Sequence, residues 1–243
     1  MQIRKYFVLI IFSAIAGTVQ AQKSNINQFV DLTGTVGESQ GSAAAAYVHN
    51  WKLGKKQKFE IGIGARFTTY FGTKKEFITA GPAKYTRSFT VPFLIFFAGQ
   101  KEENFDTLTV QRPLTNSLNI TANLGYNISP KWYAGFNIDV IGFTFGRKGT
   151  AVYLGDGANQ TEPNAKPAAF NVLLTGDHDR GTLNSEFFLK YKIADHWHIK
   201  GVYQFVFVEY ETETVQQQIV NGPVNKRFRN KANNFGLGVA YGF

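Results

Sequence analysis

The chain of 243 residues is long enough for one domain and leaves little room for a second. Its 23 Phe, 11 Tyr and 24 Gly with only 18% charged residues favour strands and turns over helices. The formal net charge is +9, but Lys and Arg are scattered rather than gathered in one stripe, which argues against nucleic-acid binding. The absence of cysteine excludes disulfides, thiolate metal sites, thiol catalysis and an acylated lipoprotein cysteine.

The N-terminal segment has the pattern of a secretory signal peptide. Arg4 and Lys5 give a positive start, and an apolar run from Tyr6 to Ala16 follows that is too short to span a bilayer. Thr18-Val19-Gln20-Ala21 then provides a cleavage site, so we expect a signal peptide over 1–21 and a mature domain over 22–243. The alternative is a short membrane anchor or a buried N-terminal strand.

The C-terminal segment alternates between two faces with the period of a strand. Small and polar residues, Asn234 to Gly242 in steps of two, fall on one face. The opposite face is fit for lipid, while the small face suits a narrow barrel interior. The apolar face consists of Phe235, Leu237, Val239, Tyr241 and Phe243.

The same alternation predicts further strands upstream. Most exceed the ordinary strand length of about five or six residues and reach the roughly 9 to 11 that cross a bilayer. The first two are weaker, since 27–37 is short and His49 interrupts the outer face of 42–53. The predicted strands cover 27–37, 42–53, 58–71, 117–128, 132–145, 182–193 and 197–210.

Connection lengths predict how these strands are arranged. Three connections, 54–57, 129–131 and 194–196, are tight, whereas those at 72–113, 146–181 and 211–230 are long; 38–41 is the short exception. Trp51, Trp132 and Trp197 each lie beside a tight turn, as an aromatic girdle at one membrane interface would. The fold class we predict is all-β: a transmembrane, antiparallel, up-and-down barrel of about eight strands, with long extracellular loops and short periplasmic turns.

On these residues the chain resembles the small eight-stranded outer-membrane barrels, including OmpX-like and OmpW-like proteins and the OmpA membrane domain. The terminal Phe243 and its alternating partners Tyr241, Val239, Leu237 and Phe235 resemble the signal read by the barrel assembly machinery. Segments 81–85 and 227–231 are similar to features of uncharacterised envelope barrels and imply no activity. The resemblance implies a location in the outer membrane of a Gram-negative bacterium, contact with lipid and lipopolysaccharide, and a monomer.

Charged residues at inward positions are expected to meet inside the barrel. Eight strands enclose an interior about wide enough to be filled by side chains, so opposite charges there should pair into a plug. The alternative is a narrow path for ions or solutes. The predicted lumen charge network comprises Asp31, Glu60, Arg66, Asp139, Glu186, Lys190, Lys192 and Lys200.

The second long loop contains an apolar run, 89–98, where an exposed loop would be polar. We expect it to form a hairpin with 105–111 that folds over the barrel mouth. Alternatively it forms a hydrophobic ligand entry or a partner surface. The predicted hydrophobic loop surface comprises Phe89, Phe93, Leu94, Ile95, Phe96 and Phe97.

No pattern for catalysis or for a cofactor is apparent. Barrels that act on lipid acyl chains need a Ser with a His base close by, and no such pair two residues apart occurs on a predicted strand. Asp177-His178-Asp179 lacks further spaced ligands and is explained by a turn before Gly181. The sequence therefore predicts a non-enzymatic barrel, without cofactor or metal, that is structural or binds through its extracellular loops. The alternatives are a passage for small hydrophobic molecules and, third, a lipid-modifying enzyme that uses His49.

Overall fold

The computed structural model describes residues 25–91, 94–155, 157–174 and 179–243. The predicted signal peptide therefore lies outside the described residues. Within the described ranges no helix has the length and apolar character to span a bilayer. The three helices described are short: α2 (Ala83–Thr86), η1 (Leu94–Phe97) and η2 (Glu102–Asn104).

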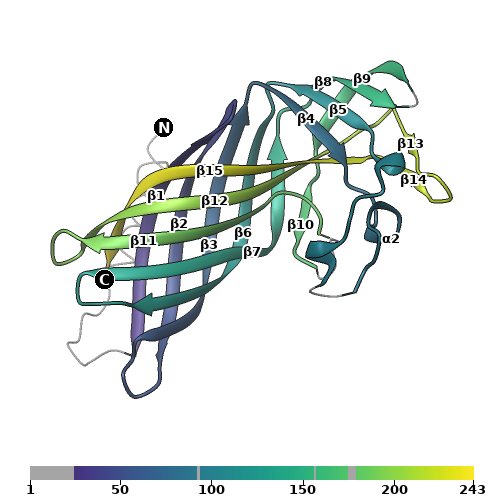
Figure 1. The fold of residues 1–243 in the computed structure, drawn as a ribbon. Coiled ribbons are helices and arrows are strands. Elements are labelled where there is room, and N and C mark those ends of the chain that lie inside the picture. Colours follow the sequence, from purple (N-terminus) through teal and green to yellow (C-terminus); the bar gives the residue numbers. More distant parts are fainter. Residues whose placement is uncertain (1–24, 92–93, 156, 175–178) are drawn as a thin grey trace, which may run out of the picture.

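Antiparallel strands make up nearly all of the remaining structure (Figure 1). The long ones are β1 (Ile26–Gly37), β2 (Gln40–Leu53), β3 (Phe59–Gly72), β6 (Leu114–Asn127), β7 (Trp132–Gly146), β11 (Leu183–Lys192), β12 (Trp197–Glu211) and β15 (Arg227–Gly242). The short ones are β4 (Lys74–Thr79), β5 (Thr107–Gln111), β8 (Gly149–Gly155), β9 (Ala158–Pro167), β10 (Phe170–Val172), β13 (Gln217–Gln218) and β14 (Val224–Asn225).

The main sheet closes on itself, which confirms the predicted antiparallel all-β architecture. Among the described residues, a ring of 12 strands runs β1–β2–β3–β6–β7–β11–β12–β9–β8–β5–β4–β15 and returns to β1. β12 also pairs directly with β15, from Trp197↔Tyr241 to Glu211↔Arg227, and so closes a shorter circuit that leaves out β4, β5, β8 and β9. This shorter circuit, whose interior we call the lumen, consists of the segments that the period-two alternation predicts.

The long connections contain more strands than the sequence pattern indicated. Figure 1 shows β4, β5, β8 and β9 gathered beyond one end of the long strands, with β13, β14 and α2 beside them. We call this part the extension.

The predicted hairpin of 89–98 with 105–111 is wrong: β5 pairs with β4 and β8, and Leu94–Phe97 forms a 3₁₀ turn. The 89–98 run lacks the polar–apolar alternation that places a strand on a half-buried sheet, whereas Leu108 and Val110 of β5 alternate with threonines.

Side chains on the long strands alternate between an exposed apolar face and a buried polar face. Leu32 is 62% exposed and Leu237 is 77% exposed, whereas Thr33 and Asn234 are at most 5% exposed. On β7 the alternation shifts at Val140, because a bulge there pairs Ile120 with Ile141 and Thr121 with Asp139. Beyond Val140 the exposed residues are therefore Ile141, Phe143 and Phe145.

The three tight connections lie at the end opposite the extension, which we call the turn end (Figure 1). Trp51, Trp132 and Trp197 flank them and are all partly exposed, between 42% and 49%. Each makes an aromatic contact, with His49, Tyr191 and Tyr241 respectively. His49 therefore belongs to an aromatic band at this end, and it is also hydrogen-bonded to Gln28 at 2.7 Å.

The apolar cores lie inside the ring at two levels. One, in the lumen near the turn end, contains Phe29, Val48, Tyr133, Phe188, Val202 and Ala240. The other fills the extension and contains Tyr70, Phe77, Leu108, Val110, Ala151, Tyr153, Ala165, Val206, Val208, Tyr210, Val215, Phe228 and Ala232. The extension is thus a packed unit built on the projecting ends of β12 and β15.

Inward glycines make room for the aromatic rings of the lumen, which gives a test of the inside–outside assignment. A Cβ on Gly135 would meet the ring of Phe188, whereas one on the outward Gly201 would meet nothing within 4 Å. Gly135→Val should destabilise the fold by about 1–3 kcal/mol, the usual cost of overpacking. Gly201→Val, the matched control, should stay within about 0.5 kcal/mol of the unchanged protein. Urea unfolding in detergent, followed by tryptophan fluorescence, measures both; equal destabilisation would contradict the assignment.

Candidate functional site

Five of the charged residues predicted to face inward form one continuous network across the lumen. Arg66 on β3 pairs with Asp139 on β7 at 2.5 Å and with Glu186 on β11 at 3.4 Å. Lys200 on β12 pairs with Glu186 at 2.9 Å and with Asp31 on β1 at 3.0 Å. All five side chains are buried. The network therefore joins strands from opposite sides of the ring through the interior.

Neutral donors and acceptors complete this network. Asp139 accepts hydrogen bonds from Asn119 at 2.7 Å and from the backbone N–H of Asn184 at 2.9 Å. Arg66 also donates to Asn137 at 2.5 Å. A buried ion pair offsets the cost of leaving water only when its remaining donors and acceptors are also bonded, and most of the atoms here meet that condition. Glu186 links the two halves of the network, since it pairs with both Arg66 and Lys200.

Glu60 is buried in the lumen but does not join the ion pairs. Its carboxylate accepts hydrogen bonds from Asn27 at 2.7 Å, Asn127 at 2.7 Å, Tyr133 at 3.1 Å and Asn50 at 3.3 Å. Four neutral donors thus occupy both carboxylate oxygens. Glu60 lies closer to the turn end than the network, because it starts β3 next to the first tight connection.

The two remaining lysines of the predicted set differ in their surroundings. Lys190 is 3% exposed, and its ammonium lies over the rings of Phe29 at 3.1 Å and Tyr133 at 4.2 Å. Lys192, two residues further towards the turn end, has a side chain 37% exposed and forms an ion pair at 3.5 Å with Asp195. Lys192 is therefore a rim residue outside the buried network.

The lumen is filled in layers from the turn end to the extension. The aromatic layer around Phe29, Tyr133 and Phe188 comes first, followed by the charge network. Above the network, Gln204 Oε1 accepts hydrogen bonds from Thr35 at 2.7 Å and Ser42 at 3.0 Å. The apolar core of the extension lies beyond. Each layer joins several strands, so the geometry is that of a plugged interior.

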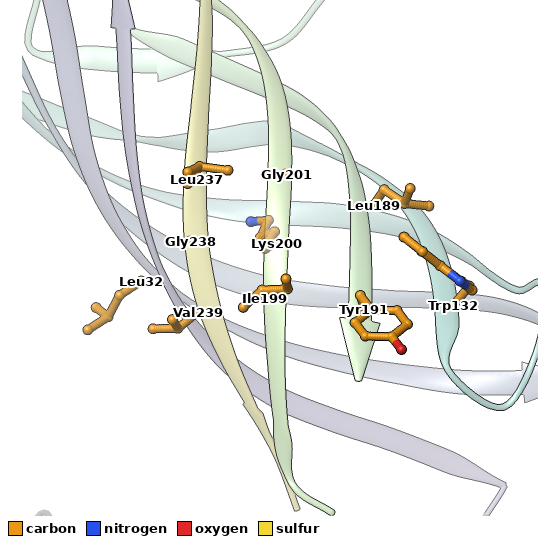
Figure 2. A pocket seen from close by; sticks show the side chains of 10 residues that line it. All are labelled: Leu32, Trp132, Leu189, Tyr191, Ile199, Lys200, Gly201, Leu237, Gly238 and Val239. Carbon is orange, nitrogen blue, oxygen red and sulfur yellow. The ribbon is translucent and has the colours of Figure 1, made fainter. Parts of the chain in front are cut away.

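The outer face carries a shallow apolar groove of about 640 Å³ across β1, β15, β12, β11 and β7 (Figure 2). It exists because Gly201 leaves a gap in a row of larger side chains, among them Leu189, Ile199 and Leu237. Figure 2 shows these side chains on the outer surface of the strands. The polar side chains among its lining residues are those of Trp132, Tyr191 and Lys200, and the Lys200 ammonium is paired inside the lumen with Asp31 and Glu186.

The predicted hydrophobic loop surface is in part exposed at the far end of the extension. Phe97 is 82% exposed, Leu94 is 55% and Phe89 is 40%. Phe93 lies outside the described residues, and the side chains of Ile95 and Phe96 are not described. The segment is anchored at its base, since Ala98 packs on Ala83 and the N–H of Ser88 donates to Gly99. The alternating C-terminal residues Phe235, Leu237 and Val239 are exposed on the outer face of β15, Phe243 is exposed just after its end, and Tyr241 is partly covered.

Sequence reasoning missed the buried charges that hold the extension. Glu209 on β12 receives Arg227 at 2.7 Å and Arg229 at 2.9 Å, both on β15. Glu162 on β9 accepts hydrogen bonds at 2.8 Å from the backbone N–H groups of Thr214 and Val215. The two arginines lie in segment 227–231, which the sequence analysis noted. Glu209 lies near the end of β12, and the alternation alone gives no indication that its carboxylate is buried.

A second group of charges in the extension is exposed. Glu213 contacts Lys166 at 2.9 Å and Lys148 at 3.1 Å. The hydrogen bonds from these two lysines lower the pKa of the Glu213 carboxyl. Exposed pairs of this kind contribute little to stability, and they offer a control for the buried network.

The described residues contain no group of three or more His, Asp or Glu side chains placed to hold a metal ion. Asp177 and His178 lie outside the described residues, and Asp179 is bound to the backbone N–H of Leu174 at 2.7 Å. His49 contacts Gln28 and Trp51, as described above.

No protein-family model matches the sequence. No curated protein matches it in sequence.

In structure the chain is similar to small outer-membrane barrels. Neisserial surface protein A has 8% identity and a TM-score of 0.39, with 90% of this chain and 98% of that one covered. A major outer membrane protein of Thermus thermophilus has 10% identity and a TM-score of 0.39, covering 90% and 100%. Ail of Yersinia pestis has 10% identity and a TM-score of 0.34, covering 90% and 95%. At these values the likeness concerns the course of the backbone alone.

The buried network predicts a large difference between buried and exposed charge substitutions. Arg66→Met leaves Asp139 and Glu186 without their shared cation, and the free energy of unfolding should fall by about 3–5 kcal/mol, as for other broken buried pairs. Lys148→Met, which breaks an exposed pair with Glu213, should cost less than about 1 kcal/mol. Denaturant unfolding in detergent measures both, and a loss in Arg66→Met no greater than that in Lys148→Met would contradict the role given to the network.

Proposed function

We propose that the protein is a non-enzymatic, integral outer-membrane barrel whose lumen is plugged and whose extension acts as a binding or structural element outside the cell. The observation that carries this is the reversed polarity of the ring. Large apolar side chains such as Phe187, at 57% exposed, face outward, while charged ones such as Asp139, at 0%, face inward. A protein surrounded by water has the opposite arrangement, and lipid is the solvent that suits this one.

The membrane-spanning part, in this proposal, is the shorter circuit of eight strands. Its strands are 10 to 16 residues long, enough for the roughly 9 to 11 residues that a tilted strand needs in a bilayer. The aromatic band with Trp51, Trp132 and Trp197 would lie at the periplasmic interface. The extension then projects on the extracellular side.

The extension has the properties of a surface for contact rather than of a flexible loop. Its apolar core and the buried Glu209–arginine pairs hold it as a packed unit on β12 and β15. At its tip, Leu94 and Phe97 expose apolar side chains. Exposed apolar groups on a rigid support are typical of interaction surfaces.

A passage for small hydrophobic molecules, which the apolar run also predicted as an alternative, is less well supported. Such a path would lead through the charge network, where Arg66 and Lys200 are tied to three carboxylates. The pocket at the turn end and the one beside α2 share no lining residue.

The membrane proposal predicts the behaviour of the purified protein. It should be recovered from the membrane fraction only with detergent, and should run faster on gels unheated than heated, because the closed sheet resists unfolding. In a planar bilayer it should show no steady ohmic conductance, since the layers fill the lumen. Recovery from the periplasm without detergent would contradict membrane residence, and a steady current would contradict the plug alone.

The orientation is tested by single-cysteine labelling, for which the cysteine-free chain is suited. Lys84→Cys lies on the exposed face of α2 in the extension, and Lys55→Cys lies in the tight connection between β2 and β3. In intact cells a membrane-impermeant maleimide should label the first and not the second. After the envelope is opened both should react, and the reverse pattern in intact cells would contradict the orientation.

A further inference from the structure

The mouth of the lumen at the turn end holds a pocket of about 140 Å³. Residues from all parts of the shorter circuit reach it, among them Glu60 on β3, Lys190 on β11, His198 on β12 and Lys131 in a tight connection. Its floor is the aromatic layer, since Phe29 and Tyr133 also line it. The volume suits a small molecule or a few waters rather than a peptide.

Two side chains in this pocket have unused polar groups. Lys190 is 3% exposed and, among the described residues, forms no ion pair or side-chain hydrogen bond; its ammonium contacts only ring faces. His198 Nδ1 is buried and makes no hydrogen bond within the described part of the chain. A buried cation is normally paired, and a buried ring nitrogen is normally bonded. Both groups border the same pocket, so one ligand could satisfy both.

The neighbouring carboxylates contact groups other than Lys190, although the second oxygen of Asp31 has no hydrogen-bond partner among the described residues. Lys190 is the direct cross-strand partner of Lys200, yet Lys200 takes both Asp31 and Glu186. Glu60, on the other side, is occupied by four neutral donors. No carboxylate of the described lumen therefore contacts the Lys190 ammonium.

The charge around the pocket favours an anion. Three lysines, Lys52, Lys131 and Lys190, line it against the single carboxylate of Glu60. Lys131 is exposed at the rim, where it can attract an anion from solvent, and Lys190 is buried at the floor, where an ion pair is screened least. Asn127 and Asn27 border the same space and add amide groups.

We propose that this pocket is a binding site for a small oxyanion, a carboxylate or a phosphate group, held by the Lys190 ammonium and by His198. The oxyanion enters from the turn end and stops at the aromatic layer. It pairs with the buried cation and accepts a hydrogen bond from His198 in the tautomer that carries its proton on Nδ1. The site is independent of the extension and does not require an open lumen.

Binding of two probes to the detergent-purified protein tests the site. Inorganic phosphate and acetate are each titrated by calorimetry, and binding of one or both is expected; which one binds identifies the oxyanion class. Lys190→Met should weaken binding about tenfold or more, because a hydrogen bond to a charged group contributes more than a neutral one. Lys192→Met is the matched control, since Lys192 lies on the same strand but pairs with Asp195 at the rim, and it should bind within about twofold of the unchanged protein.

A second measurement needs no substitution and so does not depend on a variant that folds. Trp132 lines the pocket, whereas Trp51 and Trp197 do not. In an NMR titration of the unchanged protein, the bound probe should shift the indole N–H signal of Trp132 and leave those of the other two. Absence of binding by both probes, undiminished binding in Lys190→Met, an equal loss in Lys192→Met, or equal shifts of all three indoles would each overturn the proposal.

Discussion

The structure depends on one constraint: a closed antiparallel sheet encloses a space so narrow that the side chains turned inward must pack against one another. Closure pairs the backbone groups of β1 with β2 on one side and β15 on the other, so the long strands have no free edge within the circuit. The interior cannot hold bulk water around each charge, and Arg66 and Lys200 must then be paired with carboxylates from other strands. The same closure turns the apolar residues outward, and this is the arrangement on which the proposal of a lipid environment rests.

This constraint explains the order of the layers. Inward glycines such as Gly125 and Gly135 leave the space that the rings of Tyr133 and Phe188 fill. Beyond the charges, β12 and β15 continue past the other strands and pair with each other as far as Glu211 and Arg227. Their projecting ends carry β9 and β4, and so the extension grows out of the same two strands that close the circuit. The rigidity of the extension follows from this continuity.

The sequence predicts those parts of the fold in which side chains must alternate. The long strands, the outward C-terminal residues and the inward charges follow from a period of two, because each strand is apolar on one side and polar or small on the other. The short strands β4, β8 and β9, of 6 to 10 residues, were missed because they lie inside segments whose length marked them as long loops, whereas the segment of β5 was predicted as part of a hairpin but with the wrong partner. Parity also places Lys190 and Lys200 alike, and it cannot say which of the two lysines reaches a carboxylate. In the structure Lys200 contacts two carboxylates, whereas Lys190 contacts ring faces.

The plugged lumen that we propose would confine ligand binding to the two ends of the molecule. A solute crossing the interior would have to separate Arg66 and Lys200 from their carboxylates, and each broken buried pair costs several kcal/mol. It would also have to displace the aromatic layer at one side and the apolar core of the extension at the other. The extension and the turn-end pocket are therefore separate surfaces, and a ligand at one meets a rigid, filled interior rather than a route to the other.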